Sequence, residues 1–412
     1  MGYWAEIMSK RTPRLYAALV LARAAAWASK VLLHRSGSVI GGAILMRLAA
    51  ADVERIAGRR RITFVTGTNG KSTTTAMIVA ALRRSGPVAT NAEGANTPHG
   101  LAWVVATAEV DDVVLEVDEA WLPWAVRTLR PRTAVILNLT RDQLHRKPEL
   151  RPVAAAWQEA LRSVPRVVAV AEDPTVVWAA TAAADAEYVG GTAAWSEDAI
   201  LCPNCGRLLQ SREGHWHCDC GLTRPEPTVL VRGEELFDHG TPIGRYDALP
   251  GDANLINAAA SVAAVRDRVA PAEALEAIST GVRQVAGRYG EVTVAGRHVR
   301  LLLAKNPAGW AATLGMLRPN ASTLISFSAD GVDGRDTSWL YDVDFGLLGD
   351  RPVRVTGSRG TDLAVRLHLE GIESGEAMPN VRAALEQLPE GDVDIVATYA
   401  AFQAARRELH VA

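Results

Sequence analysis

The sequence predicts an α/β protein with a central parallel-sheet domain, a cysteine-bearing insertion in that domain and a smaller α/β domain after it. Short continuous apolar runs alternate with alanine-rich helical stretches from about residue 55 onward. Such runs are typical of parallel strands that are buried on both faces of a sheet. A glycine turn with a lysine follows the first apolar run, and four cysteines interrupt the alternation between residues 195 and 235. The length of 412 residues accommodates two or three domains.

The composition is that of a soluble globular protein, with 48% hydrophobic and 22% charged residues. The formal net charge of −2 gives no general case for nucleic-acid binding. All four cysteines lie within one short stretch, and the rest of the chain has none. This clustering indicates a metal site in a reducing compartment rather than a disulfide framework.

An N-terminal helical segment is expected over residues 1–54, with an amphipathic helix at 13–35. The longest uncharged run of that helix is shorter than the ~18–20 apolar residues that a membrane span needs. Packing against the rest of the protein is the favoured interpretation, and lying on a membrane surface is the alternative. The glycine-rich residues 36–50 are expected to form a loop that leads into a hydrophobic segment.

The central domain is expected to span residues 55–285. Its strands are predicted at the apolar runs Ile62–Val65, Val113–Val117, Ala134–Leu139 and Val167–Ala171. Its helices are predicted at Thr73–Arg84, Glu119–Arg130, Pro152–Val164, Asn254–Val269 and Pro271–Val282. Ligands of such sheets bind beyond the carboxyl ends of the strands, so functional residues are sought there.

The pattern changes near Gly287, and residues 286–412 are expected to form the smaller α/β domain. Its strands are predicted at Val299–Ala304, Thr323–Phe327, Val353–Thr356 and Val393–Thr398.

The first turn carries the most specific motif, ITFVTGTNGKSTTT, at residues 62–75. A turn of backbone N–H groups that leads into a helix N-terminus binds anions. Lys71 would reach the outer phosphates of a nucleotide, and the Ser72 hydroxyl would bind Mg²⁺. Val65 stands where the general GxxxxGK[ST] pattern has its first glycine, so the shorter form GTNGKS is present. The predicted phosphate-binding residues are Gly67, Thr68, Asn69, Gly70, Lys71, Ser72 and Thr73.

The alternative is a plain glycine turn with a chance lysine. The strand before the motif, the helix after it and the scarcity of lysine, five in the whole chain, argue against that interpretation.

A carboxylate at the end of the next predicted strand completes this chemistry. Glu116 lies where a magnesium ligand is needed beside a phosphate loop. Asp118 and Glu119 follow it and are weaker candidates, and a solvated acidic turn is the alternative for all three. Asn138 and Asp142 follow another apolar run and are candidates to orient nucleotide, metal or water.

Three further residues are candidates for nucleotide contacts. Asn254 and Asn257 lie three apart near a helix start, so they share a face, and an amide suits the edge of an adenine. Helix capping is an equal alternative for Asn254. Arg288 lies at the apparent domain junction, where it would contact a terminal phosphate; a surface salt bridge is the alternative.

The cysteine stretch has the spacing of a metal knuckle pair. Cys202 and Cys205 form a CxxC, and Cys218 and Cys220 form a second, shorter pair. Four thiolates suit structural Zn²⁺ and leave no open position for catalysis. Substitution of one thiol by His215 or His217 and an empty ribbon are the alternatives.

The acid-rich loop DGRDTSWLYDVDF, residues 333–345, stands out in the last domain. Its charged side chains are not expected in a core, since Asp and Arg are rarely buried unpaired. An aspartate there would orient a histidine as the third member of a triad. All the cysteines lie in the ribbon, so the nucleophile and the histidine would come from another chain. A solvated surface loop is the alternative.

The chain resembles the Mur ligase superfamily through TGTNGKST, the strand-end Glu116, NLTRDQL, the GxxNxxN motif at 251–257 and Arg288. Within the superfamily it resembles the MurT family through the cysteine insertion, GANTPHG (94–100), LLAKNPAGW (302–310), DGRDTSW, GSRGTDLAVRL (357–367) and ATYAA (397–401). The resemblance implies a Mur-ligase-like central ATPase domain with a four-cysteine zinc-ribbon insertion at 195–235. It also implies a Rossmann-like C-terminal domain that binds an amidotransferase.

The resemblance implies a role for each matching residue. Lys71, Ser72 and Glu116 would hold ATP and Mg²⁺, with Lys71 and Glu116 catalytic; Asn254 and Asn257 would face adenine, and Arg288 the terminal phosphate. Asn306 would face the substrate cleft. The expected reaction is activation of the D-Glu α-carboxylate of the lipid II stem as an acyl phosphate, then amidation to D-isoglutamine.

The family's partner is GatD, a glutamine amidotransferase subunit with its own Cys and His, in an expected heterodimer. Asp336 is the expected aspartate of that triad, with Asp333 and Asp342 as rivals. The expected location is cytoplasmic, at the inner face of the membrane, with at most peripheral membrane contact. The alternatives are a paralogue that amidates another carboxylate, a stand-alone Mur-type amino-acid ligase and a nucleotide-binding regulatory subunit.

Overall fold

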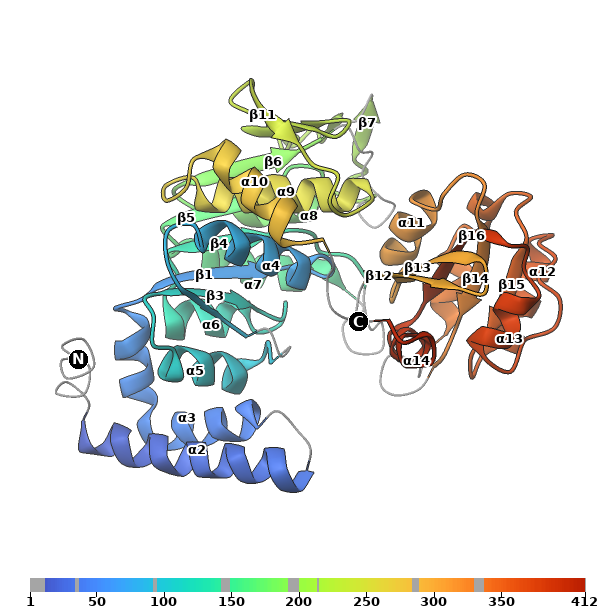
Figure 1. The fold of residues 1–412 in the computed structure, drawn as a ribbon. Helices are drawn as coiled ribbons and strands as arrows, with labels where there is room; N and C mark the ends of the chain where they lie inside the picture. The colour runs from blue at the N-terminus through green and yellow to red at the C-terminus, as the bar shows by residue number, and fades with distance from the viewer. Residues whose placement is uncertain are drawn as a thin grey trace. The chain divides into compact units, whose positions relative to one another are not determined.

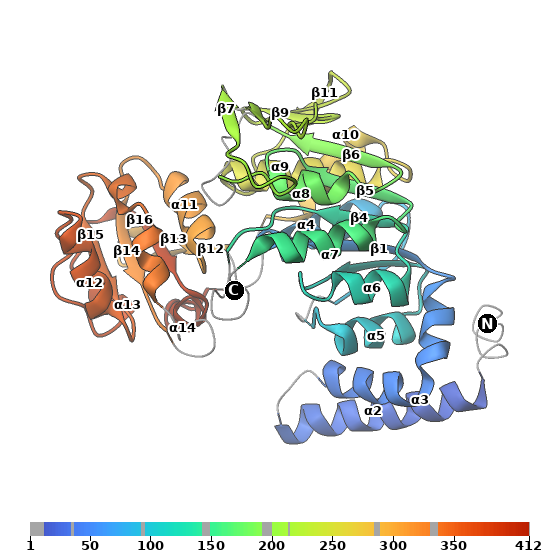
Figure 2. The same cartoon turned by 180° about the vertical axis from the view of Figure 1, so that it is seen from behind.

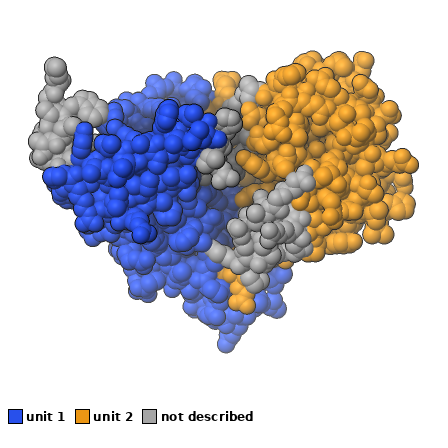
Figure 3. Space-filling model, turned by 90° about the horizontal axis from the view of Figure 1, so that it is seen from below, with its two compact units in different colours: residues 1–139, 151–246, 255–281 blue, residues 140–150, 247–254, 282–412 orange. Residues whose placement is uncertain are grey.

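The computed structural model describes residues 12–33, 37–91, 95–141, 149–191, 200–212, 215–283, 289–329 and 337–411. The chain divides into two compact units, which Figure 3 distinguishes by colour. The first comprises residues 1–139, 151–246 and 255–281, and the second comprises residues 140–150, 247–254 and 282–412.

A single large sheet forms the centre of the first unit (Figure 1), with the strand order β11-β10-β9-β6-β5-β4-β1-β3-β2. The strands from β2 to β9 in this order pair in parallel, and β9, β10 and β11 pair antiparallel. The strands are β1 (Arg61–Thr66), β2 (Val88–Thr90), β3 (Asp112–Glu116), β4 (Thr133–Ile136), β5 (Arg166–Val170), β6 (Ala186–Gly190), β9 (Val229–Arg232), β10 (Glu235–Asp238) and β11 (Thr241–Arg245). The predicted parallel α/β sheet is confirmed, and the antiparallel strands extend it at one edge.

Helices cover both faces of this sheet, with α4 and α10 on one face and α7 and α8 on the other (Figures 1 and 2). The helices are α2 (Pro13–Leu33), α3 (Ser38–Ala57), α4 (Lys71–Leu82), α5 (Pro98–Thr107), α6 (Leu122–Leu129), α7 (Leu150–Leu161), α8 (Pro174–Ala180), α9 (Asp252–Val265) and α10 (Pro271–Gly281). Covering both faces explains why the strands lack polar alternation: Ile62, Phe64 and Val65 of β1 are all fully buried.

The expected loop at residues 36–50 is wrong, because residues 38–50 are helical and form the first part of α3, which is kinked at Ala49. The glycines serve close packing instead of a turn. A Cβ on Gly42 would lie 1.7 Å from the carbonyl oxygen of His99, and one on Gly41 would meet the ring of Trp103. The absence of side chains at these two positions lets α3 approach α5 closely.

The second unit contains a five-stranded sheet in the order β12-β13-β16-β14-β15, parallel except for the β12–β13 pair. Its elements are β12 (Tyr289–Val294), β13 (Arg297–Leu303), α11 (Pro307–Gly315), β14 (Ser322–Ser326), the 3-10 helices η3 (Ser338–Asp342) and η4 (Phe345–Leu348), β15 (Val353–Thr356), α12 (Gly360–Leu369), α13 (Val381–Glu386), β16 (Gly391–Ala397) and α14 (Tyr399–Leu409). Adjacent residues such as Leu324 and Ile325 enter two different core clusters, one on each face. The predicted smaller α/β domain is confirmed.

Candidate functional site

The glycine turn joins β1 to α4, at the carboxyl edge of the sheet. Gly67 and Gly70 have φ values of 142° and 86°, which favour glycine. A Cβ on Gly67 would also lie 3.0 Å from the backbone of Asn138. The motif therefore needs glycine for both its backbone angles and its close neighbours.

Asn138, which follows β4, fixes the shape of this turn. The backbone N–H of Asn69 donates to Asn138 Oδ1 at 2.8 Å, and Asn138 Nδ2 donates back to the Asn69 carbonyl at 3.0 Å. The backbone N–H of Thr68 donates to the Asn138 carbonyl at 2.9 Å. Three bonds to one residue hold the loop in a single conformation before any ligand arrives.

Lys71 is buried and turns back into the loop. Its ammonium donates to the carbonyls of Gly67 and Thr68, the latter at 3.2 Å. Nζ also lies 3.3 Å from Glu119 Oε2, and the two side chains are 7% and 16% exposed. The carbonyl of Glu119 accepts a bond from Trp157 Nε1 at 2.8 Å, which anchors the residue to α7.

Ser72 and Glu116 lie against each other, and the Ser72 hydroxyl donates to Glu116 Oε2. The other carboxylate oxygen of Glu116 accepts from Asn96 Nδ2 at 3.1 Å. Asn91 pairs with the Glu116 backbone through two bonds of 2.8 and 2.9 Å. A hydroxyl and a carboxylate held together beside a phosphate loop are the hard oxygen ligands that Mg²⁺ prefers, so these residues fit the ion.

The other predicted nucleotide contacts lie differently. Asn257 is buried beside the turn, and a Cβ on Gly70 would be 2.7 Å from its Oδ1. The side chain of Asn254 donates to the Pro250 carbonyl at 2.7 Å. In the second unit, Asn306 caps α11 by accepting from the Gly309 N–H at 2.8 Å.

Four predicted residues fall outside the described part of the chain. These are Asp142, the candidate to orient nucleotide, metal or water; Arg288, the expected terminal-phosphate contact; and Asp333 and Asp336 of the acid-rich loop. The third aspartate of that loop, Asp342, is described: its carboxylate lies 3.2 Å from Arg141 Nη1.

Three residues of this site have roles that the sequence does not predict. Asn91 directly follows the short strand β2, and polar residues at a carboxyl strand end are informative. Asn96 lies in the GANTPHG motif. Glu119 is a weaker magnesium candidate in the sequence, whereas the structure pairs it with Lys71. No local sequence pattern predicts contacts between residues this far apart in the chain.

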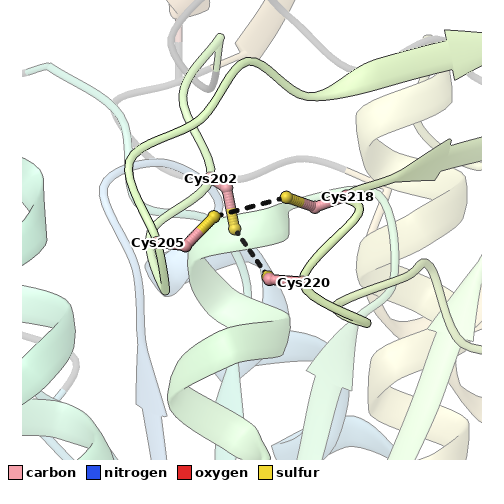
Figure 4. Close-up of side chains that lie close together, drawn as sticks. All are labelled: Cys202, Cys205, Cys218 and Cys220. Atoms are coloured by element: carbon pink, nitrogen blue, oxygen red, sulfur yellow. Dashed lines mark hydrogen bonds between the residues drawn. The ribbon is translucent and has the colours of Figure 1, made fainter.

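The four cysteine sulfurs converge in a second candidate site (Figure 4). Cys202 and Cys220 are 3.6 Å apart, Cys205 and Cys218 are 3.5 Å apart, and all four sulfurs lie within 4.8 Å of one another. Tetrahedral zinc with bonds of ~2.3 Å separates its sulfur ligands by roughly 3.8 Å. The shortened second knuckle therefore fits a zinc ion with four cysteine ligands.

Three contacts attach this ribbon to the sheet domain. Arg151 at the start of α7 donates to the carbonyl of Pro203 at 2.9 Å, inside the first knuckle. Trp216 Nε1 donates to the Ala171 carbonyl at 3.0 Å. Arg224 pairs with Glu172 at 3.0 Å, with both side chains less than a tenth exposed. Burial raises the pKa of Glu172 despite its bonds from the Gly191 N–H and Arg224.

A cavity of about 1190 Å³ lies elsewhere in the first unit, between α6 and α7. Several arginines line it. The lining also includes Thr133 and Arg166, which are the first residues of β4 and β5. The phosphate loop follows the end of β1, so the cavity lies at the opposite edge of the parallel sheet and takes no part in that site.

Two family models match the chain. The Mur ligase middle domain matches residues 65–196, and the MurT ligase C-terminal domain matches residues 303–402. The MurT subunit of lipid II isoglutaminyl synthase from Streptococcus pneumoniae is 30% identical over 410 residues, covering 89% of this chain and 90% of that protein. Its counterpart from Staphylococcus aureus strain COL is 29% identical over 389 residues, covering 87% and 89%.

Solved structures show the same fold. A pseudomurein peptide ligase type C from Methanothermus fervidus superposes with a TM-score of 0.67 at 21% identity, covering 87% of this chain and 80% of that one. The MurF ligase of Thermotoga maritima, solved with ADP, gives a TM-score of 0.61 at 15% identity, covering 90% and 84%. The phosphate loop, the cysteine cluster and these relatives agree: the chain is a ligase that belongs to the MurT family of the Mur ligase superfamily.

Proposed function

We propose that this chain is the ATP-dependent synthetase subunit of a glutamine-dependent amidating ligase acting on lipid II. It would activate the α-carboxylate of D-Glu in the stem peptide for amidation to D-isoglutamine. The observation that carries the proposal is the joint placement of Lys71, Ser72 and Glu116 at one carboxyl strand edge. The names of its relatives, which are about 30% identical over most of the chain, support the choice of substrate.

The chemistry proceeds in two steps. A carboxylate oxygen of D-Glu attacks the γ-phosphorus of ATP, which forms an acyl phosphate and releases ADP. Ammonia then attacks the acyl carbon, inorganic phosphate leaves, and the nitrogen loses a proton. An unactivated carboxylate has no adequate leaving group, so the first step is required for the second.

The residues of the site supply charge and position. Lys71 neutralises negative charge on the transferred phosphoryl group, and the N–H groups at the start of α4, beyond those of Thr68 and Asn69 that Asn138 accepts, would bind the phosphate oxygens. Ser72 and Glu116 would hold Mg²⁺, which offsets the charge on the phosphates. Asn257 lies beside the turn. The adenine roles of Asn254 and Asn257 and the terminal-phosphate role of Arg288 stay predictions.

The ammonia would come from a GatD-type glutaminase that docks on the second unit. Tyr341 of η3 and Val365 and Leu369 of α12 expose 68%, 56% and 66% of their surfaces. Val365 and Leu369 lie one turn apart on α12, and the guanidinium of Arg366 on the same helix is 5.1 Å from the Tyr341 ring centroid. Tyr341 itself belongs to the acid-rich segment at residues 333–345. Asp336 is the proposed triad aspartate; the rival Asp342 is engaged by Arg141.

The test is a mass-spectrometric assay of lipid II amidation with the co-encoded amidotransferase, ATP and glutamine. Wild-type complex should give the amide, Lys71→Ala should abolish ATP turnover, and Asp336→Asn should abolish glutamine hydrolysis. Asp342→Asn is the matched control and should retain glutaminase activity. Glutaminase coupling without lipid II amidation would retain the mechanism and reject the substrate. The absence of any glutaminase coupling would leave a stand-alone amino-acid ligase.

A further inference from the structure

Helix α2 is apolar on two opposite sides. Its inward side packs against α3 through Leu15, Ala18, Leu19, Ala22 and Ala26. Its outward side, here called the α2 face, exposes Tyr16, Val20, Leu21, Trp27, Val31 and Leu32 by 49–76% of their surfaces. Figures 1 and 2 both show α2 as the outermost layer of the first unit, with α3 between it and α5. An all-round apolar helix normally has both sides covered.

The α2 face has an ordered arrangement. At 100° per residue, one stripe along the helix consists of Tyr16, Val20, Trp27 and Val31. A second stripe, next to the first, consists of Leu21 and Leu32. Between the stripes are only alanines. Arg23 and Lys30 border the first stripe, and Arg14 lies in line with the second. Residues 12–33 contain no aspartate or glutamate.

We propose that the α2 face binds the surface of an anionic lipid bilayer, with the helix lying in the plane of the interface. An apolar stripe that contains tryptophan and tyrosine and is bordered only by cations is typical of interfacial helices. The cations complement anionic headgroups, each contributing attraction near the surface. The proposal does not rest on the proposed function, because lipid binding by this face requires neither ATP nor lipid II.

The packing and the charges of α2 argue against two other uses of the same face. By length and composition α2 passes as a candidate membrane span at Pro13–Leu32. Spanning would separate Leu15, Leu19 and Ala22 from α3 and expose the apolar surface of α3. A second copy docked face to face would bring Arg23 and Lys30 against cations, with no acidic residue of α2 to pair with them.

The experiment is co-sedimentation of the full chain with vesicles of phosphatidylcholine alone or mixed with phosphatidylglycerol. We expect partitioning onto the mixed vesicles and weak binding to phosphatidylcholine. Trp27→Ser with Leu32→Ser should lower the partition coefficient by about tenfold or more. Arg23→Gln with Lys30→Gln should lower it by about fivefold for each charge, on mixed vesicles only.

A matched control replaces exposed apolar residues elsewhere, Trp121→Ser with Ile200→Ser, and should bind as the wild type does. Thermal unfolding of all variants checks that they fold. The proposal is overturned if the wild type does not bind anionic vesicles or if the control loses binding equally. Sedimentation velocity without lipid tests whether the face binds a second copy instead. If the wild type is a dimer and the variant Trp27→Ser with Leu32→Ser is a monomer, the face belongs to a second copy and the lipid proposal is overturned. Binding to vesicles with no amidation of lipid II would overturn only the proposed function.

Discussion

Lys71 of the glycine turn and Glu119, which follows β3, form an ion pair, with Nζ 3.3 Å from Oε2 and both side chains largely shielded from water. The ammonium that we propose as a phosphate ligand thus already has an anionic partner, together with the carbonyls of Gly67 and Thr68. In the proposed function, nucleotide binding would exchange one anion for another at Lys71.

Replacing Glu119 by glutamine should strengthen nucleotide binding. The carboxylate competes with phosphate for Nζ, so its loss should lower the Kd for ATP by about twofold to fivefold. Isothermal titration calorimetry measures this, with Asp118→Asn as the control because that carboxylate caps the Ala120 N–H. A weaker affinity in Glu119→Gln would instead show that Glu119 positions Lys71 for the phosphate.

Asn96→Ala should raise the Mg²⁺ requirement of ATP turnover. Asn96 donates to Glu116 Oε1, whereas Ser72 donates to Oε2, so Asn96 helps to orient the carboxylate. Removing a residue that orients a metal ligand typically lowers metal affinity about 10–100-fold, and we expect a loss of about that size in the apparent affinity for Mg²⁺. Turnover measured against Mg²⁺ concentration should recover at high Mg²⁺. A lower maximal rate with an unchanged Mg²⁺ requirement would contradict the orienting role.

Removal of the metal should destabilise the cysteine ribbon. The four sulfurs lie within 4.8 Å of one another, and without zinc two or more thiolates would repel. We expect purified chain to contain one equivalent of zinc, and a chelator or Cys218→Ser to lower the melting temperature. Elemental analysis and calorimetry measure both effects. Cys205→Ser should reproduce them, and zinc retention in both variants would reject the four-cysteine site.

Asp394 should matter more for stability than its neighbour on β16. It is fully buried and accepts bidentate bonds of 2.9 Å from Arg300 and further bonds from Arg318. Asp394→Ala leaves a buried arginine unpaired and should cost about 3–5 kcal/mol of unfolding free energy. Asp392→Ala, the control, removes a half-exposed pair with Arg318 and should cost less than about 1 kcal/mol. Equal costs in urea denaturation would contradict this.

Asp112 should contribute stability at neutral pH that is lost in acid. Burial raises its pKa, but hydrogen bonds from Arg61 and Arg268 outweigh burial and hold the pKa below 3.8. A lowered folded-state pKa adds stability above the unfolded value, and this stability is lost as pH falls through the folded value. The stability difference between wild type and Asp112→Asn should be constant at neutral pH and shrink below about pH 4. Arg268→Gln should give a smaller difference with the same pH dependence.

The sequence by itself determined the α/β class, the two sheet domains, the phosphate turn and the cysteine knuckles. These follow from local rules: apolar runs make buried strands, glycines permit positive φ, and paired cysteines at short spacing favour a metal. The family also follows from motifs that are local in sequence.

Only the tertiary structure decided how the separate segments meet. The pairing of Lys71 with Glu119 and the support of Glu116 by Asn91 and Asn96 depend on strand order, which no local pattern encodes. Gly41 and Gly42 suggest a loop in the sequence. In the structure they lie in α3, where α5 packs directly against them. The two sides of α2 are equally apolar in sequence, and only its packing on α3 decides which side is buried and which faces outward.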